Sequence, residues 1–175
     1  EIDDHKLDQA IADLRAIMRD VPDSAHALLL LGKAHELAGS PELAQEHYQK
    51  AFNAGRQAAP FGIAYGEFLI KRGLAARAED VAGEVLRTAP GHVPAMKLLA
   101  QARINQSNWV GAQAVADELR KRDAQEQVSE QIRGAVLAAK KDYAESIAAF
   151  RRAYDAAPSD IQPMVALVRT YLLAC

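Results

Sequence analysis

The sequence predicts an all-α fold in which one antiparallel helical hairpin is repeated along the chain. Small residues recur with a constant step of 34 residues, and they do so in two separate ladders. One ladder is Gly32, Gly66, Ala100, Gly134 and Val168, and the other is Ala10, Ala44, Ala78, Ala112 and Ser146. Pro22, Pro90 and Pro158 keep the same period, with Arg56 and Ala124 at the intervening positions. A period of this length indicates stacked repeats, which form long binding surfaces.

Composition and charge support this fold and exclude several classes of protein. Half of the 175 residues are hydrophobic but only 6% are aromatic, which suits closely packed, alanine-rich helices. No segment shows the alternating Val, Ile and Thr pattern of strands. The net charge of −2 argues against a nucleic-acid partner. No apolar run approaches the length of a membrane span, and the single cysteine, Cys175, excludes an internal disulfide framework.

The clearest hairpin is predicted at residues 25–58. Ser24 is placed to cap the first helix, and the sequence Gly39-Ser40-Pro41 ends that helix and opens the second. Gly55 ends the second helix. The positions with helical three- and four-residue spacing are Leu28, Leu31, His35, Ala44, Tyr48, Ala51 and Phe52. Helices can approach to about 8 Å only where side chains are small, so we expect the ladders to mark the closest contacts within each hairpin.

Three further hairpins are predicted at residues 59–92, 93–126 and 127–160, with turns at Arg72-Gly73, Gln106-Ser107-Asn108 and Lys140-Lys141-Asp142. At the ends, residues 6–24 match a second helix alone and residues 161–175 match a first helix alone. We therefore interpret residues 1–175 as a single helical solenoid cut from a longer array, and targeting signals of the longer protein cannot be inferred from it.

The pattern resembles the tetratricopeptide repeat (TPR), a helix–turn–helix unit of the same period. The residues that carry the resemblance are Leu28, Leu31-Gly32, Ala44, Tyr48 and Ala51, then Tyr65-Gly66, Ala78 and Pro90, then Gly134, Phe150, Ala153 and Pro158. The family's usual tryptophan is replaced in every unit, by Leu28, Gly62, Met96, Glu130 and Met164. The resemblance implies a right-handed superhelix whose first helices line a concave groove for partner peptides or helices.

The resemblance also implies which residues face that groove. The predicted partner-binding residues are His26, Leu29, Lys33, Glu36, Ile63, Glu67, Ile70, Lys97, Gln101, Ile104, Gln131, Val165 and Arg169. The groove should be charged near Lys33, Glu36 and Glu67, and apolar near Ala135, Ala138 and Leu172. Alternatively, these side chains only pack between neighbouring first helices. The lysine, asparagine and arginine clamp of chaperone-binding members is absent, and so is the asparagine ladder of the sugar-transferase members.

No catalytic constellation is evident, so we predict a non-enzymatic scaffold for a protein or peptide partner, with no cofactor and no metal. His35 and His47 straddle one turn, but zinc needs three or four converging ligands, and His35 is better explained as a packed hairpin residue. The basic runs Arg120-Lys121-Arg122 and Arg151-Arg152 lie near helix C-termini, where they complement the helix dipole. The alternative function is a regulatory or substrate-recruiting arm of a larger enzyme.

The last predicted helix lacks the hairpin partner that would cover Leu167, Leu172 and Leu173. Solenoids normally end in a polar cap, so we expect this surface to self-associate or to pair with another chain; Cys175 could then form an intermolecular disulfide. The alanine-rich composition is also similar to bacterial TPR proteins of envelope and exopolysaccharide export systems, including lipoproteins linked to exosortase-type sorting. A bacterial cytoplasmic location and a periplasmic or envelope location are both compatible with the sequence.

Overall fold

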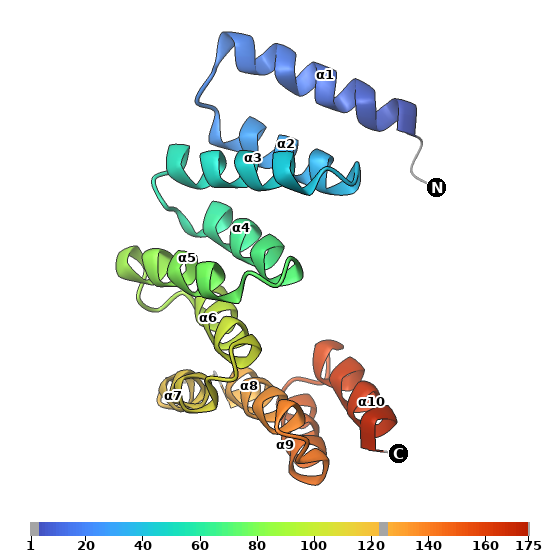
Figure 1. Cartoon of the computed structure of the whole chain (residues 1–175). Helices are drawn as coiled ribbons and strands as arrows, with labels where there is room; N and C mark the ends of the chain where they lie inside the picture. The colour runs from blue at the N-terminus through green and yellow to red at the C-terminus, as the bar shows by residue number, and fades with distance from the viewer. Residues whose placement is uncertain (1–3, 123–125, 175) are drawn as a thin grey trace. The chain divides into compact units, whose positions relative to one another are not determined.

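The computed structural model describes residues 4–122 and 126–174 (Figure 1). The described residues form ten α-helices and no strand, which confirms the all-α prediction. The helices are α1 (Asp4–Asp20), α2 (Ala25–Leu37), α3 (Pro41–Ala54), α4 (Ala59–Lys71), α5 (Ala75–Thr88), α6 (Val93–Asn105), α7 (Trp109–Arg120), α8 (Glu126–Ala139), α9 (Tyr143–Ala156) and α10 (Gln162–Ala174). Ala124 and Cys175 lie outside the described residues, as does the disulfide expected of Cys175.

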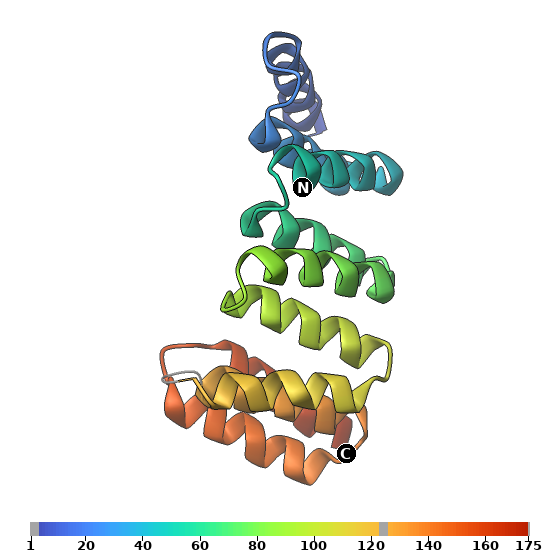
Figure 2. The same ribbon diagram turned by 90° about the vertical axis from the view of Figure 1, so that its left-hand side faces the viewer.

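The chain divides into two compact units, unit 1 over Glu1–Ala95 and unit 2 over Met96–Cys175. The boundary falls in the first turn of α6. In unit 1, consecutive helices from α1 to α5 pack against each other, and α4 and α5 form a clear hairpin (Figure 2). In unit 2, α8 packs against α7 and α9, and α9 also packs against α10.

The α2–α3 hairpin shows how short polar residues set the helix ends. The Ala27 N–H donates to Ser24 Oγ at 3.3 Å, so Ser24 caps α2 as predicted. Gly39 adopts a φ of +68°, which a side chain would oppose, and the Ser40 N–H donates to the His35 carbonyl at 2.9 Å. Pro41 then begins α3, where its missing N–H costs nothing.

The glycine ladder marks close helix contacts within the hairpins. A Cβ atom on Gly32 would lie 3.0 Å from the Tyr48 ring, and one on Gly134 would lie 2.8 Å from the Phe150 ring. At the second of these contacts the Ser146 hydroxyl, fully buried, donates to the Gly134 carbonyl at 2.8 Å. In these two hairpins the first helix therefore lies directly against an aromatic side chain from the second helix.

Gly55 is required for a different reason from the one that its position suggested. The residue caps α3 with an ordinary φ of −78°, and the left-handed conformations fall on Arg56 and Gln57 instead. A Cβ atom on Gly55 would lie 2.2 Å from Cδ2 of Phe61. Gly55 thus lets the first turn of α4 pack against the end of α3, rather than supplying a left-handed cap.

The core of each unit is built from residues of more than one hairpin. In unit 1, Ile11 of α1 packs with Leu31 and Ala34 of α2. In unit 2, Ile104, Ala112 and Val136 form a cluster. These shared clusters join successive hairpins, and they fix the surfaces on which the candidate sites lie.

Candidate functional site

In unit 1, the first helices α2 and α4 surround a charged hollow of about 300 Å³. Three predicted groove residues meet there, namely Lys33, Glu36 and Glu67. The Tyr48 hydroxyl donates to Glu36 Oε2 at 2.7 Å, and Lys71 Nζ donates to Glu36 Oε1 at 2.8 Å. Both carboxylate oxygens of Glu36 are therefore occupied by partners within the same unit.

The electrostatics of this charged hollow stabilise ionised Glu36. Burial alone would raise the pKa of Glu36, but the hydrogen bonds from Lys71 and Tyr48 and the charges of Lys71 and Lys33 outweigh it, and the pKa lies below its ordinary value. The hydrogen bond to Glu36 in turn raises the pKa of Lys71. Burial, followed by the bond to Glu36, raises the pKa of Tyr48.

The other predicted residues of unit 1 do not line the charged hollow. His26 packs edge-on against Phe61, with ring centroids 5.2 Å apart. Leu29, Ile63 and Ile70 are half-buried on α2 and α4. The residues that sequence reasoning missed are Lys71 and Tyr48, together with Leu37, Ala64 and Phe68.

In unit 2, a second hollow of about 430 Å³ opens along the first helices α6, α8 and α10; we call it the C-terminal groove. Its lining residues are Lys97, Gln101, Ile104, Gln131, Ala135, Ala138, Phe150, Gln162, Ala166, Arg169, Thr170 and Leu173. Ala135, Ala138 and Ala166 form part of the wall, and the buried ring of Phe150, from α9, adds an aromatic surface. The groove thus combines an apolar interior with a polar edge.

Asp160 binds two residues that line the C-terminal groove, Gln131 and Gln162. Its carboxylate accepts hydrogen bonds from the backbone N–H of Gln162 at 2.9 Å and from Gln131 Nε2 at 3.1 Å. The Gln162 bond is the main reason why the pKa of Asp160 lies below its ordinary value, and the charge of Lys97 lowers it further. Arg169 forms no hydrogen bond or ion pair with the other residues of 4–122 and 126–174, so its guanidinium is available to a ligand.

The structure brings together most of the groove residues predicted for unit 2. Lys97, Gln101, Gln131 and Arg169 line the C-terminal groove. Ile104 does so too, but it is only 9% exposed and also belongs to the core cluster. The predicted Val165 is exposed yet is not among the lining residues. Leu173 lines the groove in place of Leu172. Sequence reasoning also missed Phe150 of α9, because the predicted groove residues all come from first helices, and Thr170 of α10, which follows the predicted Arg169.

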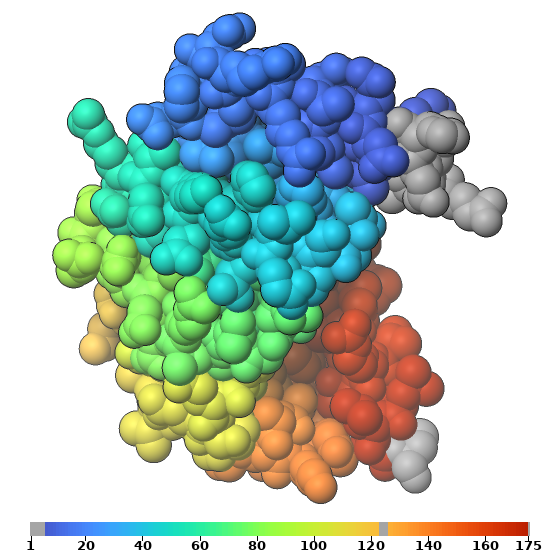
Figure 3. All heavy atoms as spheres, turned by 45° about the horizontal axis from the view of Figure 1, so that its top comes forward, coloured from blue at the N-terminus to red at the C-terminus, as the bar shows by residue number. Residues whose placement is uncertain are grey.

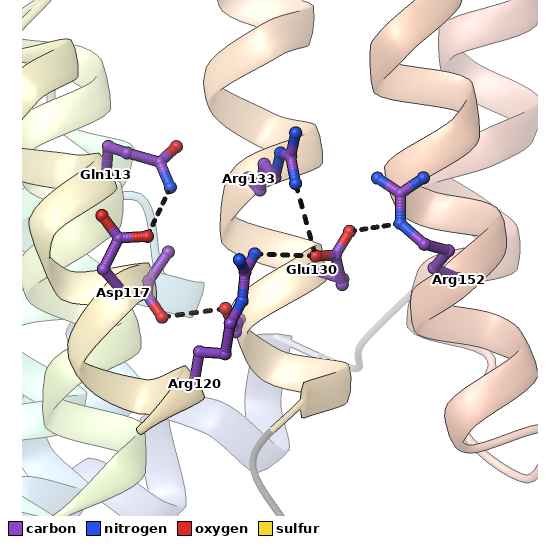
Figure 4. Close-up of polar contacts among 8 residues, drawn as sticks. Gln113, Asp117, Arg120, Glu130, Arg133 and Arg152 are labelled. Atoms are coloured by element: carbon purple, nitrogen blue, oxygen red, sulfur yellow. Dashed lines mark hydrogen bonds and ion pairs between the residues drawn. The ribbon is translucent and has the colours of Figure 1, made fainter. Parts of the chain in front are cut away.

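Glu130 lies at the centre of a further polar cluster, which is formed by side chains from α7, α8 and α9 (Figure 4). Its side chain is 6% exposed and stands where the family usually has tryptophan. Arg120 donates to Oε1 at 3.0 Å and Arg152 to Oε2 at 2.8 Å, while Arg133 lies 3.8 Å from Oε1. Arg120 and Arg152 belong to the basic runs that the sequence assigned to the helix dipole; the structure adds a specific carboxylate partner.

The histidines and carboxylates that the structure describes do not converge on a metal centre. His35 is buried and its ring centroid lies 5.1 Å from that of His47, in agreement with a packed hairpin histidine. Burial is the main reason that the pKa of His35 lies below its ordinary value. Among the described residues, no group of three or more His, Cys, Asp or Glu side chains could hold a metal ion. No helix in that part of the chain is long and apolar enough to cross a membrane.

These features define a class of protein. Tandem antiparallel hairpins with open hollows along their first helices are the architecture of helical-repeat interaction scaffolds. The sequence model of the tetratricopeptide repeat matches residues 1–62 and 131–161, which together make up more than half of the chain. The chain therefore belongs to the tetratricopeptide repeat family.

Solved structures have the same fold. A TPR protein from Parabacteroides merdae superposes with a TM-score of 0.72 and 19% identity, over 98% of this chain and 68% of that one. A TPR protein from Thermus thermophilus gives 0.68 and 16%, over 85% and 82%. MamA from Desulfovibrio magneticus gives 0.61 and 19%, over 86% and 85%. No curated protein sequence is significantly similar to this chain.

Proposed function

We propose that the C-terminal groove binds an apolar segment of a partner protein, a helix or an extended peptide, with a carboxylate directed toward Lys97 or Arg169. The observation that carries this proposal is the hollow itself, which is open along three first helices and lined by alanines. The division of the chain into repeats at 25–58, 59–92, 93–126 and 127–160 is part of the same proposal.

The shape of the groove favours a narrow, apolar ligand. Ala135, Ala138 and Ala166 leave space that longer side chains would fill, and Phe150 offers an aromatic face. Burying apolar surface contributes about 25 cal/mol per Å², so a few anchoring side chains suffice for a specific complex. Apolar anchors at helical spacing, or alternate side chains of an extended segment, are the usual ways of entering such a groove.

The charge of the groove favours an acidic residue beside those anchors. Arg169 has no hydrogen-bond or ion-pair partner among the described residues, and the positive charge of Lys97 acts on Asp160. An incoming carboxylate would form a charge-assisted hydrogen bond with Arg169, and such bonds are stronger than neutral ones. Electrostatic complementarity of this kind sets orientation and selectivity more than affinity.

The experiment selects peptides that bind the chain from a displayed library and then measures each binder against two variants. Ala138→Glu places a long charged side chain in the groove, and Glu36 shows that a glutamate is accommodated at this position of the repeat. The matched control is Ala144→Glu, at an exposed site on α9. We expect binding to fall at least tenfold with Ala138→Glu and to persist with Ala144→Glu. Selected peptides that bind both variants equally well would refute the groove.

A further inference from the structure

A larger hollow of unit 1, of about 690 Å³, lies between α1, α2 and α3. We call it the basic hollow, because Arg15, His47, Lys50 and Arg56 are among its lining residues. In the space-filling view of Figure 3, α1 (dark blue) and α3 (cyan) lie on the same exposed face of the unit. The basic hollow shares no lining residue with the charged hollow or with the C-terminal groove.

The basic hollow carries positive charge that is largely free to meet a ligand. The side chains of Arg15 and Arg56 form no hydrogen bond or ion pair with the rest of the described chain. Lys50 lies 2.6 Å from Glu46, but both side chains are more than half exposed, so this ion pair is weak. Of the described residues that line the hollow, only Asp23 is acidic, which leaves two positive charges in excess.

This charge belongs to one hairpin and is not a feature of the repeat. The positions one period after Arg15, His47, Lys50 and Arg56 hold, in the same order, Gln49, Val81, Glu84 and Pro90. The later positions contain no cation, and a carboxylate stands at the position of Lys50. Helix packing in the repeat therefore does not require the basic side chains of the hollow.

The backbone of Arg56 gives a second reason to assign a role to its side chain. Arg56 has a φ of +53°, a left-handed conformation that glycine adopts freely and that a side chain opposes. Gly55 cannot take over this conformation, because it has a φ of −78° and packs against Phe61. Backbone geometry alone favours glycine at position 56, so an arginine there is better explained by what its guanidinium contacts.

Two histidines complete the polar side of the basic hollow. His47 Nδ1 donates to the Leu43 carbonyl at 2.7 Å, which fixes the orientation of the ring. The neighbouring His35 is 4% exposed, and its ring centroid lies 5.1 Å from that of His47. His35 Nε2 is buried and has no hydrogen-bond partner among the described residues. Buried polar atoms almost always have a partner, so an unpaired nitrogen next to this wall indicates a polar occupant of the hollow.

We propose that the basic hollow binds a small organic phosphate monoester with an apolar body. A phosphate monoester carries nearly two negative charges at neutral pH and three acceptor oxygens, which match the excess charge of the hollow. Guanidinium groups bind phosphate through paired hydrogen bonds. Met18, Leu28 and Leu31 supply an apolar wall for the rest of the molecule, and the volume is typical of small-molecule sites. This function is separate from peptide binding in the C-terminal groove.

The test measures binding of phenyl phosphate by calorimetry at low salt. Arg15→Gln and Arg56→Gly each remove one cation, and Arg87→Gln removes the same charge from an exposed position of α5 that does not line the hollow. We expect both variants to bind about fivefold more weakly or less, and the control to bind as wild type does. Arg56→Gly should stay as stable as wild type in thermal unfolding, because glycine accepts the positive φ. Absence of binding by wild type, or equal binding by all variants, would overturn the proposal.

Three further probes test the chemical class of the ligand. Inorganic phosphate lacks the apolar body and phenyl sulfate has a single negative charge, so each should bind more weakly than phenyl phosphate. Equal affinity for either would overturn the assignment of an apolar phosphate monoester. A phosphotyrosine peptide that binds more than about tenfold tighter than phenyl phosphate would replace the small molecule by a phosphorylated protein. A peptide selected on the C-terminal groove should bind Arg15→Gln and wild type equally, so the two proposals can fail separately.

Discussion

The charged hollow of unit 1 and the C-terminal groove of unit 2 occupy the same positions of the repeat, three periods apart. Glu36, Tyr48 and Lys71 in the charged hollow correspond to Ala138, Phe150 and Leu173 in the groove. The further pairs are Lys33 with Ala135, Ala64 with Ala166, Glu67 with Arg169, and Phe68 with Thr170. One repeat geometry therefore produces two surfaces of different chemistry.

The difference lies in which groups find partners within the unit. In the charged hollow, the Tyr48 hydroxyl and Lys71 saturate the carboxylate of Glu36. In the groove, hydrocarbon side chains replace the hydroxyl, carboxylate and ammonium groups of the charged hollow, and Arg169 occupies the repeat position of Glu67. A hollow whose polar groups are paired by hydrogen bonds within the unit contributes to folding, whereas we propose that the equivalent hollow without those bonds binds a partner.

The largest effect on stability should come from overfilling the core beneath the groove. Ala112 is fully buried beside Ile104 and Val136. Ala112→Leu adds bulk with no space to receive it and should destabilise the chain by about 1–3 kcal/mol. Thermal unfolding measures the loss. An unchanged melting temperature would contradict the helix register on which the correspondence between the two hollows rests.

A smaller effect should distinguish the two glycines that face the aromatic rings. Alanine gains about 1 kcal/mol of helix propensity over glycine, but its Cβ at position 134 would lie 2.8 Å from the Phe150 ring, against 3.0 Å from Tyr48 at position 32. Gly134→Ala should therefore destabilise by about 1 kcal/mol net, and Gly32→Ala by less. Denaturant unfolding of both variants checks the order, and the reverse order would contradict the tighter packing at Phe150.

Exchanging the two aromatic residues probes the hydroxyl directly. Tyr48→Phe removes a hydrogen bond to a charged carboxylate and should cost about 1 kcal/mol. Phe150→Tyr should gain nothing alone, because Ala138 offers no acceptor, and should become favourable when combined with Ala138→Glu. A double-mutant cycle of Phe150→Tyr and Ala138→Glu, followed by denaturant unfolding, measures the coupling free energy. Zero coupling would contradict the role assigned to the hydroxyl–carboxylate hydrogen bond at these two positions of the repeat.

The smallest effect concerns acid stability. Because the pKa of Glu36 in the folded chain is lowered, its contribution to stability is present above its ordinary value of 4.5 and is lost as the pH falls through the lowered pKa. Glu36→Gln should flatten this part of the stability curve. The contribution is modest because Lys71 is largely exposed. A Glu36→Gln curve parallel to that of wild type would contradict the network.

Sequence reasoning predicted much of the fold because its signals are local and periodic. The Ser24 cap, the Gly39-Ser40-Pro41 turn and the small-residue contacts at Gly32 and Gly134 all follow from short-range chemistry. Gly55 could not be explained in that way, since its constraint comes from Phe61 in the next helix.

The candidate sites were predicted less completely. Rows of first-helix residues identified Lys97, Gln101 and Arg169, but which neighbour enters a hollow depends on helix rotation, so Leu173 was missed in favour of Leu172. The Glu130 cluster was missed because two of its arginines, Arg120 and Arg152, lie on other helices. The hydrogen bonds to Glu36 distinguish the charged hollow from the C-terminal groove. They depend on interatomic distances, which the spacing of residues in a sequence does not give.

The most direct test transfers the closed network of unit 1 into unit 2. The variant Ala138→Glu, Phe150→Tyr and Leu173→Lys is assayed by calorimetry against a peptide selected on the wild-type chain. The mirror variant, Glu36→Ala, Tyr48→Phe and Lys71→Leu, is the control. We predict that the first variant stays folded and binds the peptide at least tenfold more weakly, a loss of about 1.4 kcal/mol or more, while the mirror variant binds as wild type does. Undiminished binding by a folded first variant would contradict the proposal that the C-terminal groove is the binding surface.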